Sequence, residues 1–226
     1  MRGFSVTSIG LLLGLLVISG CDDRKTIVGN DQIAGSGRIV SQNRTAGEFS
    51  GIRVTNFATV VITQDSATSV RVEADDNIIG RVQTAVNNGV LDVGLEQGSY
   101  NNVTIRVYLS TPTLTLLEST GAANFTAADS IHTDDLTCRI TGAGSIRLTG
   151  TAVHQSVIIT GAGDVRNFGL MSSQCSVSIS GSGNVEVTAM QELTAMIAGT
   201  GSITYDGNPP LVHQTITGVG SIRPKQ

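Results

Sequence analysis

A short glycine-centred phrase occurs six times in the second half of this chain. Its leading glycines follow one another at intervals of 21, 19, 20, 18 and 19 residues. A period near 19 residues is too short for an array of helix pairs and is typical of one coil of a β-solenoid. The phrases are Thr120–Phe125, Thr141–Ile146, Thr160–Val165, Ser180–Val185, Ala198–Ile203 and Thr217–Ile222. The chain is therefore predicted to build a rod of stacked coils.

Two aliphatic positions recur in each repeat, one of them two residues before the leading glycine and the other four residues after it. A solenoid buries such positions by stacking like on like, with neighbouring coils about 4.8 Å apart. Ser119 opens the first column in place of an aliphatic residue. The predicted core columns are Ile140, Ile159, Ile179, Ile197 and Ile216, and Phe125, Ile146, Val165, Val185, Ile203 and Ile222.

Between the two columns the chain must turn sharply beside its neighbours, which glycine does without strain. The predicted turn glycines are Gly121, Gly142, Gly144, Gly161, Gly163, Gly181, Gly183, Gly199, Gly201, Gly218 and Gly220. The position three residues after each leading glycine is always small and polar. We interpret this column first as a structural ladder of hydrogen bonds and second as a binding surface. Its members are Asn124, Ser145, Asp164, Asn184, Ser202 and Ser221.

Residues 38–117 show a different pattern, in which apolar residues alternate with polar ones in short runs typical of half-buried strands. Asn88-Gly89 predicts a two-residue hairpin, and residues 75–79 fit one helical turn. We therefore predict an all-β fold in which N-terminal antiparallel strands and hairpins lead into a single-stranded β-solenoid of about six coils. A right-handed β-helix is the expected form. One domain should span residues 38–226, with its coils over 118–226.

The first residues predict export. A positive charge at Arg2 precedes the apolar run Ile9–Val17, whose nine residues are too few to span a bilayer. The sequence Ile18-Ser19-Gly20-Cys21 resembles a bacterial lipobox, which implies removal of residues 1–20 and lipidation of Cys21. Residues 21–37 then form a tether. The resemblance also implies a sorting role for Asp22 and Asp23, which would retain the lipoprotein on the periplasmic face of the inner membrane; otherwise the outer membrane is expected.

Charge and composition exclude several classes of function. Removing residues 1–20 takes Arg2 from the 14 basic residues, which leaves 13 against 18 acidic residues and a net charge of −5. A chain with this balance is not expected to bind nucleic acid, which requires basic stripes. The absence of tryptophan also leaves little material for a sugar-stacking platform.

No catalytic or metal site is expected. Glycoside chemistry needs two carboxylates that face each other across the bond, and no matching acid recurs in neighbouring coils at the offset of the pair Asp134-Asp135, which we interpret as a solvated loop. His132, His154 and His213 lie at different offsets from their glycines, so they do not predict a metal cluster. No cofactor is expected.

Cys138 and Cys175 precede glycines that lie two coils apart. Two coils separate backbones by about 9.6 Å, whereas a disulfide needs Cα atoms within about 7 Å. We therefore predict two buried free thiols. A monomer is also expected, because Pro224 and Lys225 should discourage pairing at the open edge of the last coil.

The chain resembles the bacterial family described as putative auto-transporter adhesin, head GIN domain. The resemblance is carried by the Gly-x-Gly repeats, by Phe49-Ser50-Gly51-Ile52-Arg53-Val54 and by Val103-Thr104-Ile105-Arg106-Val107-Tyr108, and it extends from about Ile39 to Arg223. It implies a β-helical exported domain at the cell envelope, without catalytic residues.

Three functions stay open at this point. The first is a lipid-anchored interaction module whose Thr/Ser/Asn-rich face contacts a glycan or an envelope protein. The second is a structural or regulatory periplasmic lipoprotein without a ligand of its own. The third is a polysaccharide-active β-helix enzyme.

Overall fold

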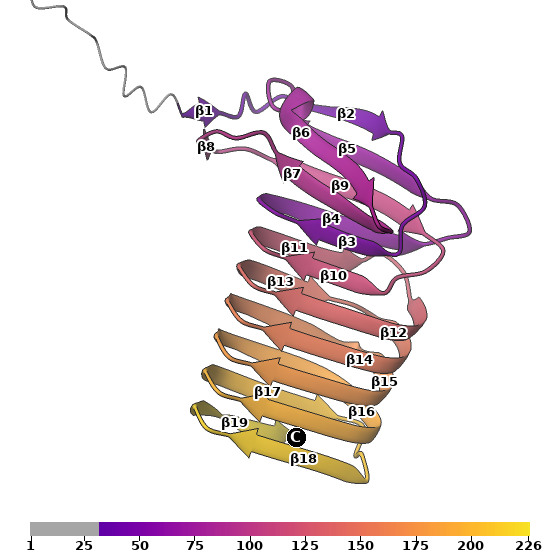
Figure 1. The fold of residues 1–226 in the computed structure, drawn as a ribbon, viewed down its shortest axis with the longest axis vertical. Helices are drawn as coiled ribbons and strands as arrows, with labels where there is room; N and C mark the ends of the chain where they lie inside the picture. The colour runs from indigo at the N-terminus through magenta and orange to yellow at the C-terminus, as the bar shows by residue number, and fades with distance from the viewer. Residues whose placement is uncertain (1–31) are drawn as a thin grey trace, which may run out of the picture. The chain divides into compact units, whose positions relative to one another are not determined.

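Strands make up nearly all of residues 32–226, the part of the chain that the computed structural model describes (Figure 1). The strands before the repeats are β1 (Ile33–Ala34), β2 (Ile39–Arg44), β3 (Gly51–Val54), β4 (Phe57–Gln64), β5 (Ser69–Asp75), β6 (Val82–Asn87), β7 (Val90–Leu95), β8 (Tyr100–Asn101) and β9 (Ile105–Thr111). A single 3₁₀ turn, η1 (Ile79–Arg81), lies just after the position at which a helical turn was predicted. Among the described residues, no helix has the length and apolar character that crossing a membrane requires.

The repeats form paired strands. These are β10 (Leu116–Ser119), β11 (Ala122–Ala127), β12 (Ile131–Ile140), β13 (Ala143–Arg147), β14 (Gly150–Ile159), β15 (Ala162–Ile179), β16 (Ser182–Ile197), β17 (Thr200–Asp206), β18 (Leu211–Ile216) and β19 (Val219–Pro224). Each glycine phrase joins a strand of one sheet to a strand of a second sheet. The predicted β-solenoid is therefore confirmed.

Two long sheets enclose the core. The first sheet runs in the order β6, β7, β3, β10, β12, β14, the C-terminal half of β15, the C-terminal half of β16 and β18. The second sheet runs in the order β2, β5, β9, β4, β11, β13, the N-terminal half of β15, the N-terminal half of β16, β17 and β19. From β7 and β9 onward, all these pairings are parallel.

The predicted core columns lie at the centre of this stack. Register pairs Ile140 with Ile159, and then Ile159 with Ile179, so that identical side chains pack on one another. Ile140, Ile159, Ile179 and Ile197 are fully buried, as are Ile146, Val165 and Ile203. Ser119 fits at the head of its column because its hydroxyl donates to the Ala143 carbonyl at 2.8 Å.

The last member of the first column is not buried, contrary to the prediction that the whole column lies in the core. Ile216 lies in register with Ile197, but 44% of its surface is exposed, because no further coil covers β18 among the described residues. Ile222 in β19 is only partly buried for the same reason. The ammonium group of Lys225 lies 2.9 Å from Asp206 on the preceding coil and over the Phe168 ring. The expected monomer stays a prediction.

The stack also begins earlier than the glycine phrases. Strands β3 and β4 form a coil of their own, with Asn56 at the position of the leading glycine, and β4 pairs in parallel with β11. Antiparallel strands then close this end: β6 pairs with β7, and β5 pairs with β9. The predicted Asn88-Gly89 hairpin is confirmed, with φ of 51° and 75° at the two residues.

The leading glycines are required by close backbone approach between coils. A Cβ placed on Gly181 would overlap the carbonyl oxygens of Gly161 and Thr160, and the same holds down the column. Of the predicted turn glycines, only Gly144 has a φ in the left-handed region, at 134°. Other residues could therefore adopt the backbone conformation of most of these turns. A side chain at the leading glycine would not fit, because it would overlap the backbone of the neighbouring coil.

Cys138 and Cys175 are free and buried, as predicted. Cys138 stacks on Val157 and Cys175 on Gln155, so the two sulfur atoms occupy neighbouring columns of the core. Burial raises the pKa of each thiol to about 12. Both side chains thus act as small apolar groups.

Replacing Ile159 by Asp should unfold the rod, because the charge would be buried without a partner between two coils. We expect a loss of more than about 3 kcal/mol in the free energy of unfolding. Ile216→Asp is the matched control, since it makes the same change in the same column at an exposed position, and it should cost less than about 1 kcal/mol. Chemical denaturation followed by circular dichroism measures both; equal losses would contradict the assigned column.

Replacing Gly181 by Ala should destabilise the stack, since the added methyl group would meet backbone atoms that cannot rotate away. We expect a loss of about 2 kcal/mol or more. Gly80→Ala, where a Cβ would meet nothing within 4 Å, should change stability by less than about 0.5 kcal/mol. A melting temperature unchanged in both variants would show that the coils are not in backbone contact.

The two buried thiols should make stability fall at high pH. Their pKa values are raised on folding from 9.0 to about 12, so the stabilisation is complete below about pH 9 and is lost as the pH rises toward 12. The free energy of unfolding should fall by up to about 1.4 kcal/mol per pH unit for each thiol. The variant Cys138→Ala, Cys175→Ala should show a shallower slope over this range, and identical slopes would rule out the effect.

Candidate functional site

The small polar column lies on the outer face of the second sheet and forms a hydrogen-bonded ladder, as predicted. The Ser145 hydroxyl donates to Asn124 Oδ1 at 2.7 Å. Asn184 Nδ2 donates to Asp164 Oδ1 at 3.2 Å, and the Ser202 hydroxyl donates to Asn184 Oδ1 at 2.8 Å. Each of these bonds joins neighbouring coils. The ladder therefore has two segments among the described residues, Asn124 with Ser145 and Asp164 with Asn184 and Ser202, and Ser221 takes no part in it. The side chains of both segments are fixed along the stack while their outer surfaces stay open to solvent.

A second outward column runs beside the first, five residues after each leading glycine. Its members, in coil order, are Thr126, Arg147, Arg166, Glu186, Thr204 and Arg223. These residues were not predicted as a column, although the same offset from the glycine identifies them in the sequence. The two columns together line a polar groove of about 240 Å³ that contains Arg166, Arg223 and the residues between them. We call the outer side of these two columns the second-sheet face.

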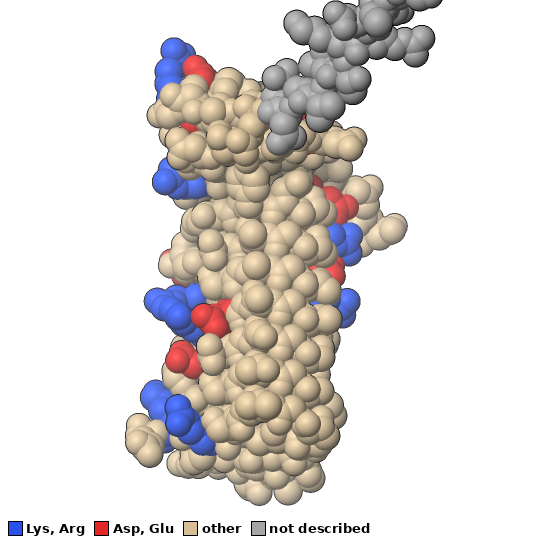
Figure 2. Space-filling view, turned by 90° about the vertical axis from the view of Figure 1, so that its left-hand side faces the viewer, with Lys and Arg blue, Asp and Glu red and all other residues tan. Residues whose placement is uncertain are grey.

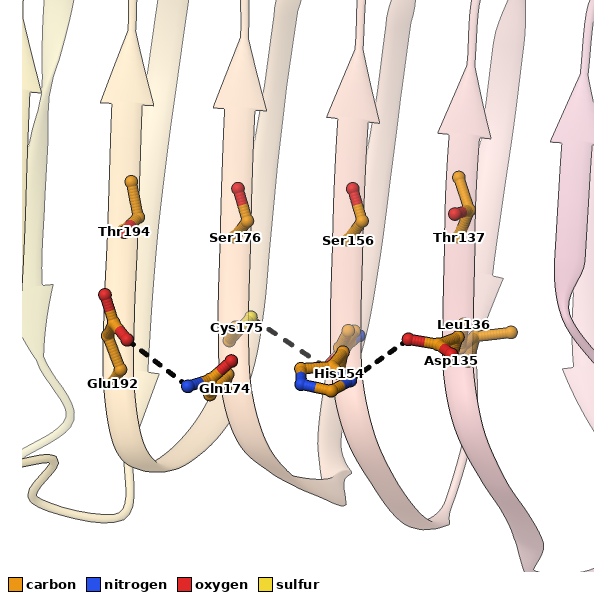
Figure 3. Close-up of a pocket in the computed structure, with 11 residues that line it drawn as sticks. Asp135, Leu136, Thr137, His154, Ser156, Gln174, Cys175, Ser176, Glu192 and Thr194 are labelled. Carbon is orange, nitrogen blue, oxygen red and sulfur yellow. Dashed lines mark hydrogen bonds and ion pairs between the residues drawn. The ribbon is translucent and has the colours of Figure 1, made fainter.

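The first sheet carries another groove, of about 230 Å³ (Figure 3). One row of side chains comes from the strands β12, β14, β15 and β16, and hydrogen bonds join it in two pairs. His154 Nδ1 lies 3.0 Å from Asp135 Oδ1, and Gln174 donates to Glu192 at 3.4 Å. Beside this row stands a row of hydroxyl groups from Thr137, Ser156, Ser176 and Thr194. In Figure 3 these strands run upward while the coils advance to the left, which is the expected right-handed winding.

Asp134 and Asp135 were interpreted as a solvated loop, but the structure places both of them on strand β12 with their side chains exposed. Asp135 and Glu192 are three coils apart, which corresponds to about 14 Å and exceeds the about 6.5–9.5 Å between the carboxylates of inverting glycosidases. No hydroxyl among the described residues other than Thr151, which contacts His132, is hydrogen-bonded to a histidine ring. The geometry of this groove suits hydrogen bonding to a ligand.

The histidines also lie as predicted, on separate rows. His132 pairs with Thr151, His154 with Asp135 and His213 with Thr194. Within residues 32–226, no group of three or more metal-ligating side chains comes together. The predicted lipidation site Cys21 and the sorting residues Asp22 and Asp23 lie outside the described residues.

Solved structures share this architecture. The crystal structure of a putative adhesin from Bacteroides fragilis NCTC 9343 superposes with a TM-score of 0.70 at 22% identity, covering 85% of this chain and all of that one. A putative adhesin from Parabacteroides distasonis ATCC 8503 gives a TM-score of 0.56 at 21% identity, covering 86% and 100%. A putative lipid binding protein from the same organism gives 0.51 at 21% identity, with the same coverage. At these identities the likeness shows the fold.

Among curated proteins, none matches this sequence. The family model described as putative auto-transporter adhesin, head GIN domain, matches residues 48–209, which include the early coil and most of the glycine repeats. This match agrees with the resemblance carried by the repeats, and it covers more than half of the chain. The chain therefore belongs to the putative auto-transporter adhesin, head GIN domain family.

Proposed function

We propose that this protein is a non-catalytic, adhesin-like module of the cell envelope that contacts a glycan or an envelope protein through its second-sheet face. Membership of the head GIN family supports an adhesin-like role at the cell surface or envelope. The hydrogen-bonded ladder is the observation that carries the choice of face. Its hydroxyl and amide groups repeat at the coil spacing and are held in place before any ligand arrives.

The physical value of the ladder is preorganisation. A polar side chain that must be ordered on binding costs about 0.5–1.5 kcal/mol. Asn184 accepts a hydrogen bond from Ser202 and donates one to Asp164, so much of this ordering is already complete. A ligand with hydroxyl or amide groups at a matching repeat would bind several coils at once. The rigid stack fixes the spacing of these hydroxyl and amide groups along the rod.

The proposed anchor is a lipid group on Cys21. The lipobox-like sequence Ile18-Ser19-Gly20-Cys21 supports it, and several acyl chains on one cysteine give stable attachment to a membrane. Asp22 and Asp23 favour the periplasmic face of the inner membrane where the sorting rule for such aspartates applies, and the outer membrane otherwise. The expected tether is shorter than residues 21–37, because Ile33–Ala34 pair with Tyr100–Asn101 and the Gly37 N–H donates to Asp75. Residues 22–31 would link the lipid group to the rod.

Fractionation of the native host tests the anchor. The protein should partition with membranes, whereas a Cys21→Ser variant should appear in the soluble fraction or in the unprocessed form. Protease treatment of intact cells then separates two functions: release of the rod supports an exposed interaction module. Complete protection would favour the alternative of a structural or regulatory periplasmic lipoprotein.

Adhesion of cells that display the protein tests the face. Asn184→Ala, Ser202→Ala should lower adhesion to the host's own envelope material several-fold, because it removes the longer ladder segment and leaves the core unchanged. Ser176→Ala, Thr194→Ala makes the same kind of change on the first sheet and should have no effect. Equal loss in both variants would contradict the choice of face, and turnover of a polysaccharide by the wild-type protein would contradict the non-catalytic role.

A further inference from the structure

We infer that the second-sheet face binds an acidic polysaccharide, laid across the coils between Arg147 and Arg223. This inference rests on the proposed function and names the chemical class of its ligand. Its starting point is a local excess of positive charge on a protein whose net charge is −4. Four arginines, Arg106, Arg147, Arg166 and Arg223, point outward from the second sheet between β9 and β19.

Few of these charges are neutralised within the described residues. Arg166 lies 3.5 Å from Asp164, and Lys225 is paired with Asp206 at 2.9 Å. Arg106, Arg147 and Arg223 form no ion pair with the described residues, and Glu186 is the one acid in these columns that is also unpaired. In Figure 2, blue side chains recur along the left-hand margin of the molecule, and red side chains lie next to several of them.

The spacing of the arginines favours an extended anion. Arg147 and Arg166 follow residues paired on neighbouring coils, Ile146 and Val165, so two like charges lie one coil apart. Like charges at this separation repel each other, and an anion between them would relieve the repulsion. Arg223 lies three coils beyond Arg166, which corresponds to about 14 Å. A single small anion cannot span this distance, whereas a chain with repeated acidic groups can.

The groove between the arginines suits sugars. Asn184, Ser202 and Thr204 line it, together with two carboxylates: Glu186, which is unpaired, and Asp164, which is paired with Arg166. These groups can donate to and accept from the hydroxyl groups of a sugar, and the guanidinium groups bind carboxylate, sulfate or phosphate oxygens in bidentate fashion. A membrane surface fits less well, because the local excess of charge is small and no large exposed apolar side chain is found among the residues that line the groove.

The first sheet shows that this arrangement is particular to one face. There, Arg53 is bonded to Glu118 at 2.8 Å and to Asp92 at 3.1 Å, and Arg139 lies 3.8 Å from Glu118. Its arginines are therefore already occupied by acids of the protein. An acidic ligand would meet the carboxylates of Asp135 and Glu192 on that side.

Binding of the full chain in detergent micelles to immobilised polygalacturonate tests the inference, with neutral dextran as the reference. We expect binding to polygalacturonate that weakens with added salt, and at least about tenfold weaker binding to dextran. Arg147→Gln, Arg223→Gln should weaken binding to polygalacturonate about tenfold or more. Arg81→Gln, Arg139→Gln makes the same change in net charge elsewhere and should retain affinity within about twofold.

Three results would overturn the inference: equal binding to dextran and polygalacturonate, equal weakening by both double variants, or stronger binding to phosphatidylglycerol vesicles than to polygalacturonate. A melting temperature within a few degrees of wild type, measured on each variant, excludes unfolding as the cause. The adhesion experiment separates the two proposals. Adhesion that is lost in Asn184→Ala, Ser202→Ala but kept in Arg147→Gln, Arg223→Gln would preserve the proposed function and overturn the acidic ligand.

Discussion

Backbone contact between successive coils, along the column of leading glycines, is the constraint on which the rest of this structure depends. The absence of a Cβ lets the carbonyl oxygen of one coil approach the glycine of the next, as at Gly161 and Gly181. Each glycine N–H then donates to the preceding coil: Gly161 to Ile140 at 3.2 Å and Gly181 to Ile159 at 3.2 Å. These bonds fix the register, and register decides which side chains stack inside and which line up outside.

Two properties of the rod follow from this register. The outward residues form straight rows, so residues of one type that recur at the same offset in the sequence form a continuous polar or charged face. The two ends are also unequal, since antiparallel strands close the stack beyond β3 and β4, whereas β18 and β19 carry exposed edges among the described residues. The two ladder segments, Asn124–Ser145 and Asp164–Ser202, and the exposed surface of Ile216 are consequences of the same stacking.

The periodic part of the fold could be predicted from the sequence because every coil of a solenoid repeats the same local structure. Offsets from the glycine were enough to identify Ile159 as core and Asn184 as surface. The early coil was missed because Asn56 replaces the glycine, so its place is visible only through pairing with β11. Ile216 was assigned to the core because an offset carries no information about whether another coil follows.

The faces were harder to predict than the core. Whether an arginine finds an acid depends on its neighbours in adjacent coils, which are distant in sequence: Glu118 is 65 residues from Arg53 and Asp92 is 39 residues from it. Arg53, for example, is satisfied by Glu118 and Asp92 from two other strands, while Arg147 has no such partner among the described residues. The charge difference between the two faces could therefore be predicted only from the pairing of strands in three dimensions.

Hydrogen exchange measured residue by residue tests the stacking account most directly. Amides that bond to a neighbouring coil and are covered by another, such as those of Gly161 and Gly181, should exchange slowly and together. The amides of Thr217 and Gly218 also bond to the preceding coil but are uncovered, and they should exchange fastest within the stack. Equal protection in β18–β19 and β14–β16, or rapid exchange throughout the glycine column, would contradict the account.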